Sequence, residues 1–178
     1  FSLGSGPWLI EGAGYDPTAI TQLVGDAYDH GKWDGAGITS SAAAANPSLT
    51  AIGVGDNSIL GLTGYDNQNI GTNTLILAYT WIGDANLDGQ VSTSDFVTLS
   101  SNFNKSGQVW AQGDFNYDGV VNALDFNAVA TNFGSPQIVS PSDVIPGALP
   151  QTALGTLVPE PASLGLLANA LGSGPLSA

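Results

Sequence analysis

Hydrophobic positions in the first half of the chain follow the periods of short strands and one amphipathic helix. Residues 8–10 form a short apolar run that is typical of a strand. A helix is predicted to begin at Asp16-Pro17, because Asp is a favoured N-cap and Pro is favoured at the first helical position. Its apolar positions follow the spacing i, i+3, i+4, i+7 and i+8: Ile20, Leu23, Val24, Ala27 and Tyr28. Gly31 is predicted to end this helix.

From residue 49 the pattern changes to that of strands. Residues 49–54 and 59–62 are predicted as short strands joined by a turn, and residues 72–81 give the clearest strand pattern in the chain. Residues 42–45 are predicted to form one helical turn before Asn46-Pro47. Together these elements predict a small β-rich or α+β unit over residues 1–82.

A 12-residue polar pattern then occurs twice, beginning at Asp84 and again 30 residues later at Asp114. Each copy has oxygen-bearing side chains at positions 1, 3, 5, 9 and 12 and glycine at position 6. This is the ligand order of an EF-hand calcium loop, with Asp in place of the usual Glu at position 12. The pattern therefore predicts two calcium loops within residues 83–134.

Each loop is followed by a helical stripe of apolar residues at i, i+3 and i+7. The two stripes are Phe96, Leu99 and Phe103, and Phe126, Val129 and Phe133. We expect the two helices to pack face to face around a small shared core, capped by Trp81 and Trp110.

Residues 135–178 are rich in Pro, Ser, Gly, Leu and Ala, with charge only at Asp143 and Glu160. This composition favours a linker or an extended arm. The predicted fold class is α+β: a small β-rich N-terminal unit, two loop–helix calcium motifs and an extended C-terminal tail.

The charge balance fits cation binding. The chain has 15 acidic residues against two lysines, and its net charge is −13. This argues against nucleic acid and anionic membranes as partners, because both require clustered Lys or Arg. Six of the carboxylates lie in the two loops, so two Ca²⁺ ions would bring the charge to −9. No run of about 18 apolar residues is present, so no membrane-spanning segment is expected.

The sequence shows no enzyme motif, and we expect a chain without catalytic activity. His30 is the only histidine, and there is no cysteine. Asp26 and Asp29 are paired carboxylates of the kind that a glycosidase uses. We prefer the interpretation that they lie on the solvent-exposed face of a helix. The four tryptophans form either a carbohydrate platform or, as we prefer, parts of the core or an interface. Asn104 begins the sole N-x-S/T sequon and is a candidate glycosylation site.

The two loops, each followed by one helix and lacking the incoming helix of an EF-hand, resemble type I dockerin modules. The resemblance covers about 50 residues of this chain. It implies a pair of loop–helix motifs related by pseudo-two-fold symmetry, two structural Ca²⁺ ions, and attachment to a protein partner, which in cellulosomes is a cohesin domain. The ligands that it implies are Asp84, Asn86, Asp88, Gln90, Ser92 and Asp95 in the first loop, and Asp114, Asn116, Asp118, Val120, Asn122 and Asp125 in the second. Gln90 and Val120 would ligate through their backbone carbonyls.

Loop positions 10 and 11 carry partner recognition in this family, usually with small hydroxyl residues. The first repeat follows this pattern with Thr93-Ser94, whereas the second has Ala123-Leu124. Leu124 could instead pack against another part of this chain or a neighbouring copy.

The segment 158–167, VPEPASLGLL, resembles the start of a PEP-CTERM sorting signal of planctomycete-like bacteria, although no terminal Arg follows it. Such a signal and structural calcium both favour an extracellular or cell-surface location, where calcium is millimolar.

Two functions follow from these observations. The first is a structural protein whose apolar arms, residues 8–10 and 162–171, add to sheet edges of neighbouring copies and build a surface filament. The alternative is the dockerin anchoring module of a larger secreted, carbohydrate-active protein, which docks to a cohesin-like partner.

Overall fold

The computed structural model describes residues 1–3, 6–12 and 14–138. The chain divides into two units, residues 1–144 and 145–178, and every described residue belongs to the first. The sorting-signal resemblance at 158–167 and the predicted apolar arm at 162–171 lie outside the described residues.

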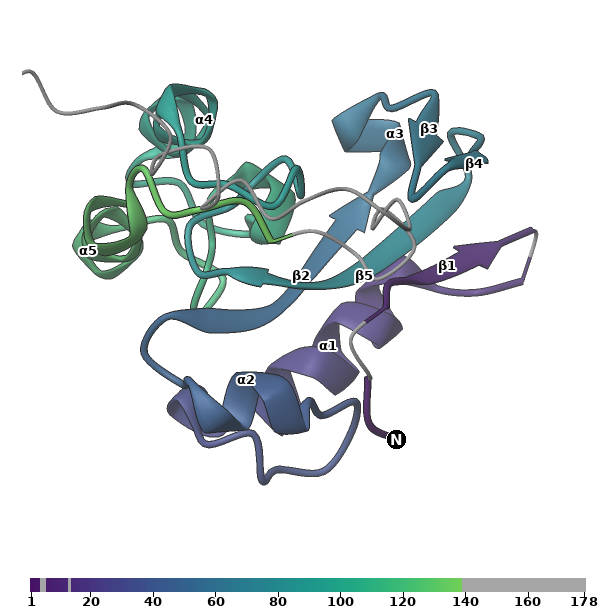
Figure 1. Cartoon of the computed structure of the whole chain (residues 1–178), viewed down its shortest axis with the longest axis horizontal. Coiled ribbons are helices and arrows are strands. Elements are labelled where there is room, and N and C mark those ends of the chain that lie inside the picture. The colour runs from purple at the N-terminus through teal and green to yellow at the C-terminus, as the bar shows by residue number, and fades with distance from the viewer. Residues whose placement is uncertain (4–5, 13, 139–178) are drawn as a thin grey trace, which may run out of the picture. The chain divides into compact units, whose positions relative to one another are not determined.

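A three-stranded antiparallel sheet forms the centre of the described fold (Figure 1). Its strands are β1 (Trp8–Glu11), β2 (Thr50–Asp56) and β5 (Thr74–Trp81), in the order β1-β5-β2. The central strand β5 is the predicted strand at residues 72–81. It pairs with β1 on one side and with β2 on the other, so that Leu77, for example, lies opposite both Trp8 and Val54. Residues 8–10 are therefore an edge strand of the chain's own sheet. The prediction that they form a free assembly arm is wrong, because their backbone pairs with β5 along one side.

Helix α1 (Pro17–Tyr28) confirms the predicted helix and its N-cap, since the Asp16 side chain accepts a hydrogen bond from the Thr18 amide. The helix passes into the short 3₁₀ helix η1 (Asp29–Gly31), and α2 (Ser41–Ala45) is the predicted alanine turn. Both α1 and α2 contact β2, and they lie on the same side of the sheet in Figure 1.

The strand predicted at residues 59–62 is wrong, because this segment begins with a helical turn. Helix α3 (Asn57–Leu60) is capped by Asp56, whose side chain accepts from the Ser58 amide, and it ends at Gly61 in the left-handed conformation. These are the usual start and stop signals of a helix, and they override the apolar pattern of Ile59-Leu60. The following turn at residues 64–69 forms a small hairpin of β3 (Gly64–Tyr65) and β4 (Gln68–Asn69).

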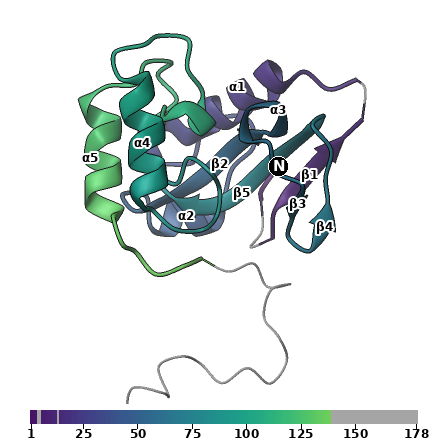
Figure 2. The ribbon, with the colours of Figure 1, turned by 90° about the horizontal axis from the view of Figure 1, so that it is seen from above.

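The two helices of the repeat, α4 (Thr93–Asn102) and α5 (Ala123–Asn132), lie side by side in both views (Figures 1 and 2). The expectation that their whole apolar stripes form a shared core is only partly met. Leu99 and Val129 are buried, whereas the phenylalanines of both stripes are exposed by 40–56%. The phenylalanines at the first stripe position contact each other across the helix pair, with ring centroids 6.2 Å apart: Phe96 and Phe126.

The module shares a core with the N-terminal unit instead of enclosing one entirely of its own. One cluster of buried side chains runs from Leu3 to Val129 and includes residues of both the N-terminal unit and the repeat. Trp110, in the short 3₁₀ helix η2 (Trp110–Gln112), is fully buried within it, whereas Trp81 is only partly buried. The boundary at residue 82 thus separates sequence motifs, while the packing across it is continuous.

Glycines in β2 provide the space for this packing. A Cβ on Gly53 would lie 2.7 Å from Trp110 Nε1 and would overlap the side chain of Leu87, and one on Gly55 would also crowd Leu87. The side chain of Leu87, at position 4 of the first loop, therefore occupies a gap in the sheet surface that the two glycines leave open.

We expect Gly53→Ala to destabilise the protein by about 1–3 kcal/mol, because an added methyl group overpacks a filled site. Urea denaturation measures the change, with Gly71→Ala as the control, since a Cβ at Gly71 meets no atom within 4 Å. Equal unfolding midpoints for the two variants would contradict the close packing of the repeat on β2.

Candidate metal-binding loops

The two predicted loops have the same backbone conformation. Position 4 is left-handed in both, with φ of 59° at Leu87 and 60° at Tyr117. Position 6 is also left-handed, with φ of 84° at Gly89 and 80° at Gly119. Glycine at position 6 is needed because side chains rarely tolerate this conformation. The sequence repeat is thus also a structural repeat.

The carboxylates at position 1 are buried and turned into their loops. Asp84 accepts hydrogen bonds from the amides of Gly89 (2.9 Å) and Asp88 (3.2 Å). In the second loop, Asp114 accepts from the Gly119 amide at 2.9 Å. Each of these hydrogen bonds joins a backbone amide of the loop to the carboxylate that the EF-hand pattern assigns to the metal.

The carboxylates at position 12 close the other end of each loop. Asp95 accepts from the amides of Ala85 and Ser92, both at 2.9 Å. Asp125 accepts from the amides of Phe115 (2.8 Å) and Asn122 (2.9 Å). These contacts bring the first and last ligand positions of each loop together.

Positions 9 and 12 also start the following helices. Ser92 is the N-cap of α4 and Asn122 is the N-cap of α5, and in each case the aspartate at N3 completes a capping box. The same side chains therefore serve as helix caps and as predicted metal ligands. The pattern S/N-x-x-D is the sequence signal for these boxes, which were not predicted.

The remaining predicted ligands line the open side of each loop. Asn86 and Asn116 accept from the amides two residues later, each at 3.0 Å. The position-5 carboxylates accept from the position-7 amides at 2.9 Å and 2.8 Å: Asp88 from Gln90, and Asp118 from Val120. The structure thus places all twelve predicted ligands in two equivalent loops.

No three His, Cys, Asp or Glu side chains approach closely enough to hold a metal ion within residues 1–3, 6–12 and 14–138. The amide groups of Asn86 and Asn116 donate to the carboxylates of Asp88 and Asp118, at 2.9 Å and 2.8 Å. These bonds use carboxylate oxygens that a cation would otherwise bind, and like-charged carboxylates repel one another without a cation between them.

Burial makes the charged form of these carboxylates costly. Desolvation raises the pKa of Asp84 to about 7 and that of Asp114 to about 6. Desolvation also raises the pKa of Asp125. A nearby positive charge would lower all three values.

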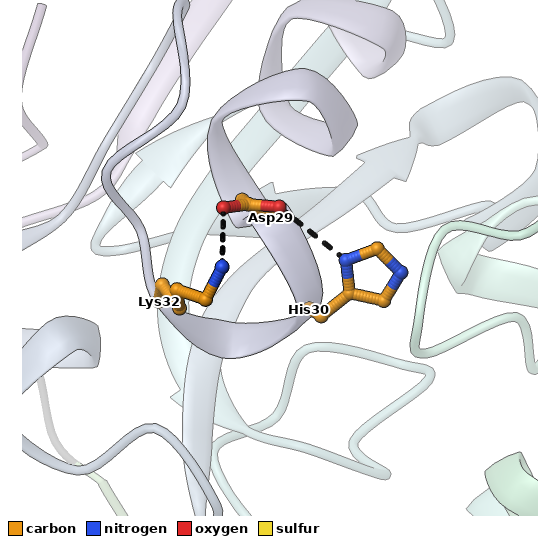
Figure 3. A network of polar contacts seen from close by, with 3 residues as sticks. All are labelled: Asp29, His30 and Lys32. Atoms are coloured by element: carbon orange, nitrogen blue, oxygen red, sulfur yellow. Dashed lines mark hydrogen bonds and ion pairs between the residues drawn. The ribbon is translucent and has the colours of Figure 1, made fainter.

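The chain offers these carboxylates no positive side chain. Lys32 is paired with Asp29 at 2.9 Å in an exposed network at the end of α1, which also includes His30 (Figure 3). Lys105 bonds Asn102 instead. Moreover, Asp114 Oδ1 is buried without a hydrogen-bond partner. A buried carboxylate needs pairing with a cation or a metal, so this donor set fits an oxygen-preferring cation such as Ca²⁺.

Several supporting residues were not predicted from the sequence. Thr80, at the end of β5, donates its hydroxyl to the Asp84 carboxylate. Asn132 Nδ2 donates to the carbonyl of Ile82 at 2.7 Å, and its equivalent Asn102 donates to that of Gln112 at 2.9 Å. The repeated Asn-Phe at the helix ends was the sequence signal for this pair.

Helices α4 and α5 expose several large apolar side chains and no charged one. The only charged residues in these helices are Asp95 and Asp125, and both are buried. Of the exposed large hydrophobic residues in the described chain, most lie within residues 96–133: Phe96, Val97, Phe103, Val120, Leu124, Phe126 and Phe133. We call all of these residues except Val120 the phenylalanine face: Phe96, Val97, Phe103, Leu124, Phe126 and Phe133.

Loop positions 10 and 11, where the resemblance places partner recognition, lie at the start of these helices. Thr93 and Ser94 are exposed at the start of α4, and Ala123 and Leu124 are exposed at the start of α5. Leu124 is 62% exposed, so packing against the described part of its own chain does not account for it.

The other candidate residues lie apart from the loops. Asn104 is exposed just beyond α4, and its glycosylation stays a prediction. Trp33 and Trp110 are buried and Trp8 and Trp81 are partly buried, so the tryptophans serve the core and do not form one exposed platform. Among the helices of the described residues, none has the length and hydrophobicity needed to span a bilayer.

The fold and the loops together define a paired loop–helix module of the calcium-binding kind. Residues 82–134 match the family model of the dockerin type I domain. This part of the chain is therefore a type I dockerin-like domain. Domains of this family bind calcium, mediate docking between proteins, typically to cohesins, and occur in extracellular or cell-surface proteins. Neither curated proteins nor solved structures gave a match to the chain.

With calcium chelated, we expect the protein to melt at a higher temperature at pH 5 than at pH 7.5. The raised pKa values of Asp84 and Asp114 mean that the folded state binds protons more tightly than the unfolded state between about pH 4 and pH 7. The free energy of unfolding therefore falls as pH rises through this range. Thermal melts in EGTA measure the effect.

Asp84→Asn should weaken this pH dependence, because it removes one of the two buried titrating groups, the one with the more strongly raised pKa. Asp34→Asn, at an exposed position, should leave it unchanged. The same slope in both variants would show that general charge repulsion, and not the loop carboxylate, causes the dependence.

Proposed function

We propose that this chain is a non-catalytic, extracellular attachment protein. Its dockerin-like domain binds two Ca²⁺ ions, one in each loop, and the ordered domain docks to a cohesin-like protein domain through the phenylalanine face. The observation that carries the proposal is an exposed, charge-free apolar face on two helices whose first turns are built from the calcium loops.

The proposed calcium ligands support this face directly. Ser92 and Asp95 cap α4 while closing the first loop, and Asn122 and Asp125 do the same for α5. A cation held by these oxygens neutralises buried carboxylates and so fixes the starts of both helices. Partner recognition at positions 10 and 11 lies in the same first turns.

The chemistry of the face indicates the kind of partner. With no charged side chain exposed on α4 or α5, binding relies on apolar burial and on hydroxyl and amide hydrogen bonds. A flat, largely uncharged protein surface is complementary to it, and its affinity should depend weakly on salt. The first turn of α4 presents the hydroxyl groups of Thr93 and Ser94, whereas the first turn of α5 presents the apolar side chain of Leu124.

Self-assembly into a filament receives less support. One of its two proposed arms is the edge strand β1 of the chain's own sheet. The other lies outside the described residues. Docking to a cohesin-like partner is therefore the function that we favour.

We expect calcium to raise the melting temperature and EGTA to lower it, because an ion that binds only the folded state stabilises by about 2.7 kcal/mol at a hundredfold excess over its Kd. Asp88→Ala and Asp118→Ala should each reduce the calcium stoichiometry from two to one, measured by isothermal titration calorimetry. An unchanged melt in EGTA, or two tightly bound ions in either variant, would refute the calcium assignment.

We expect Leu124→Ser and Phe126→Ser to weaken docking to a cohesin-like domain by roughly tenfold or more, because each removes apolar area from the centre or end of the face. Surface plasmon resonance against a panel of cohesin domains measures this, and calorimetry checks that two calcium ions still bind. Ile59→Ser is the matched control, since Ile59 is 47% exposed on α3, away from the face. Failure of the whole panel to bind the unchanged protein would sink the proposal.

A further inference from the structure

Each calcium loop is crossed by the segment that follows the helix of the other repeat. We call residues 104–108 the second-loop strap and residues 134–138 the first-loop strap. The Asn104 amide donates to the carbonyl of Val121 at 2.8 Å, and 30 residues later the Gly134 amide donates to that of Val91 at 2.9 Å. These two bonds are equivalent under the repeat.

The far ends of the straps are equivalent too. The carbonyl oxygen of Gly119 accepts from the amides of Gly107 at 2.7 Å and Gln108 at 3.4 Å, and that of Gly89 accepts from the Ile138 amide at 2.8 Å. Both glycines are at position 6, between the ligand positions 5 and 7. Each strap therefore holds the turn on which the middle ligands depend.

The first-loop strap makes additional contacts that have no counterpart in the second. Gln137 Nε2 donates to the carbonyl of Asp88 at 3.2 Å, and Trp81 Nε1 donates to that of Pro136 at 2.8 Å. In the second-loop strap, Gln108 Nε2 instead donates to Ser106 within the strap itself at 3.1 Å. The first loop is thus held by a side chain as well as by backbone bonds.

The two position-6 glycines show the same difference. A Cβ on Gly89 would overlap the carbonyl oxygen of Ile138, whereas a Cβ on Gly119 would meet no atom within 4 Å. The first-loop strap therefore lies directly against the turn, and the second-loop strap leaves space beside it.

We infer that residues 134–138 are a positioning element of the first calcium site, with Gln137 and Ile138 as its positioning residues. The family match ends at residue 134, so most of this element lies beyond the matched segment. By bonding the carbonyls of Asp88 and Gly89, the strap fixes the chain between the side-chain ligand Asp88 and the carbonyl ligand Gln90. Fixing a loop in its bound conformation before the ion arrives raises affinity, because less ordering remains to be done on binding.

This inference rests on the proposed function, because it assumes that both loops bind calcium. The test is a calcium titration of the full chain followed by NMR, which resolves the two loops. The amides at positions 89 and 119 donate to Asp84 and Asp114 respectively, so each reports on its own loop.

We expect Gln137→Ala to weaken calcium binding in the first loop by about three- to tenfold and to leave the second loop unchanged. Gln108→Ala is the matched control and should change neither affinity. Because Gln137 is exposed, its replacement is not expected to unfold the protein.

A second pair of variants separates the strap from backbone strain. Gly89→Ala and Gly119→Ala introduce a side chain at nearly the same positive φ, but only the first displaces a strap. We expect Gly89→Ala to weaken the first loop at least tenfold more than Gly119→Ala weakens the second, and to speed hydrogen exchange of the Ile138 amide.

Equal losses in the two glycine variants, or an unchanged first loop in Gln137→Ala, would overturn the role of the strap while leaving calcium binding intact. If the unchanged protein binds no calcium at either loop, the proposed function fails, and the inference fails with it.

Discussion

Four buried carboxylates without a cationic side chain partner govern the structure of the repeat. Asp84, Asp95, Asp114 and Asp125 are each at most 3% exposed, and both lysines of the chain bond elsewhere. Burial of an unpaired charge is expensive, and here backbone amides offset part of the cost. Desolvation outweighs these hydrogen bonds and raises the pKa of Asp84 and of Asp114. In the function that we propose, a bound cation would supply the missing charge, and order in the loops and in the first turns of α4 and α5 would then depend on calcium.

The second constraint is the seating of this module on the N-terminal sheet. Position 4 of each loop is left-handed and directs its side chain to the N-terminal unit. Leu87 occupies the gap left by Gly53 and Gly55, and the Tyr117 hydroxyl donates to the carbonyl of Ile52. Trp110 packs between them, with its ring centroid 5.5 Å from that of Tyr117 and its indole N–H on the carbonyl of Asp84. Because one side of the module is used in this way, the outer side of α4 and α5 is the one left for a partner.

Local signals that act within a few residues were read correctly from the sequence. A helix begins at Asp16-Pro17 and a strand lies within residues 72–81, as predicted. The 12-residue repeat forms two loops with matching hydrogen bonds. Each of these features depends on backbone groups that are close in the sequence. The reading failed where an apolar pattern was short, as at residues 59–62, since four apolar or small residues suit a strand and a capped helical turn equally well. Asp56 is a favoured N-cap residue, but the apolar pattern of residues 59–62 led to the prediction of a strand.

The sequence by itself determined the positions and spacing of the predicted metal-binding oxygens, because these are set by a tight loop closed on its own amides. It also determined the excess of acidic over basic residues, which favours binding of a cation. Only the tertiary structure decided which apolar residues become core and which become surface. Phe96 and Leu99 belong to the same helical stripe, yet Leu99 is buried and Phe96 is 40% exposed. Leu99 lies against Gly113, just before the second loop, whereas Phe96 contacts Phe126 of the neighbouring helix. The strap across Gly89 was likewise invisible in the sequence, since it joins segments nearly 50 residues apart through backbone groups that every residue carries.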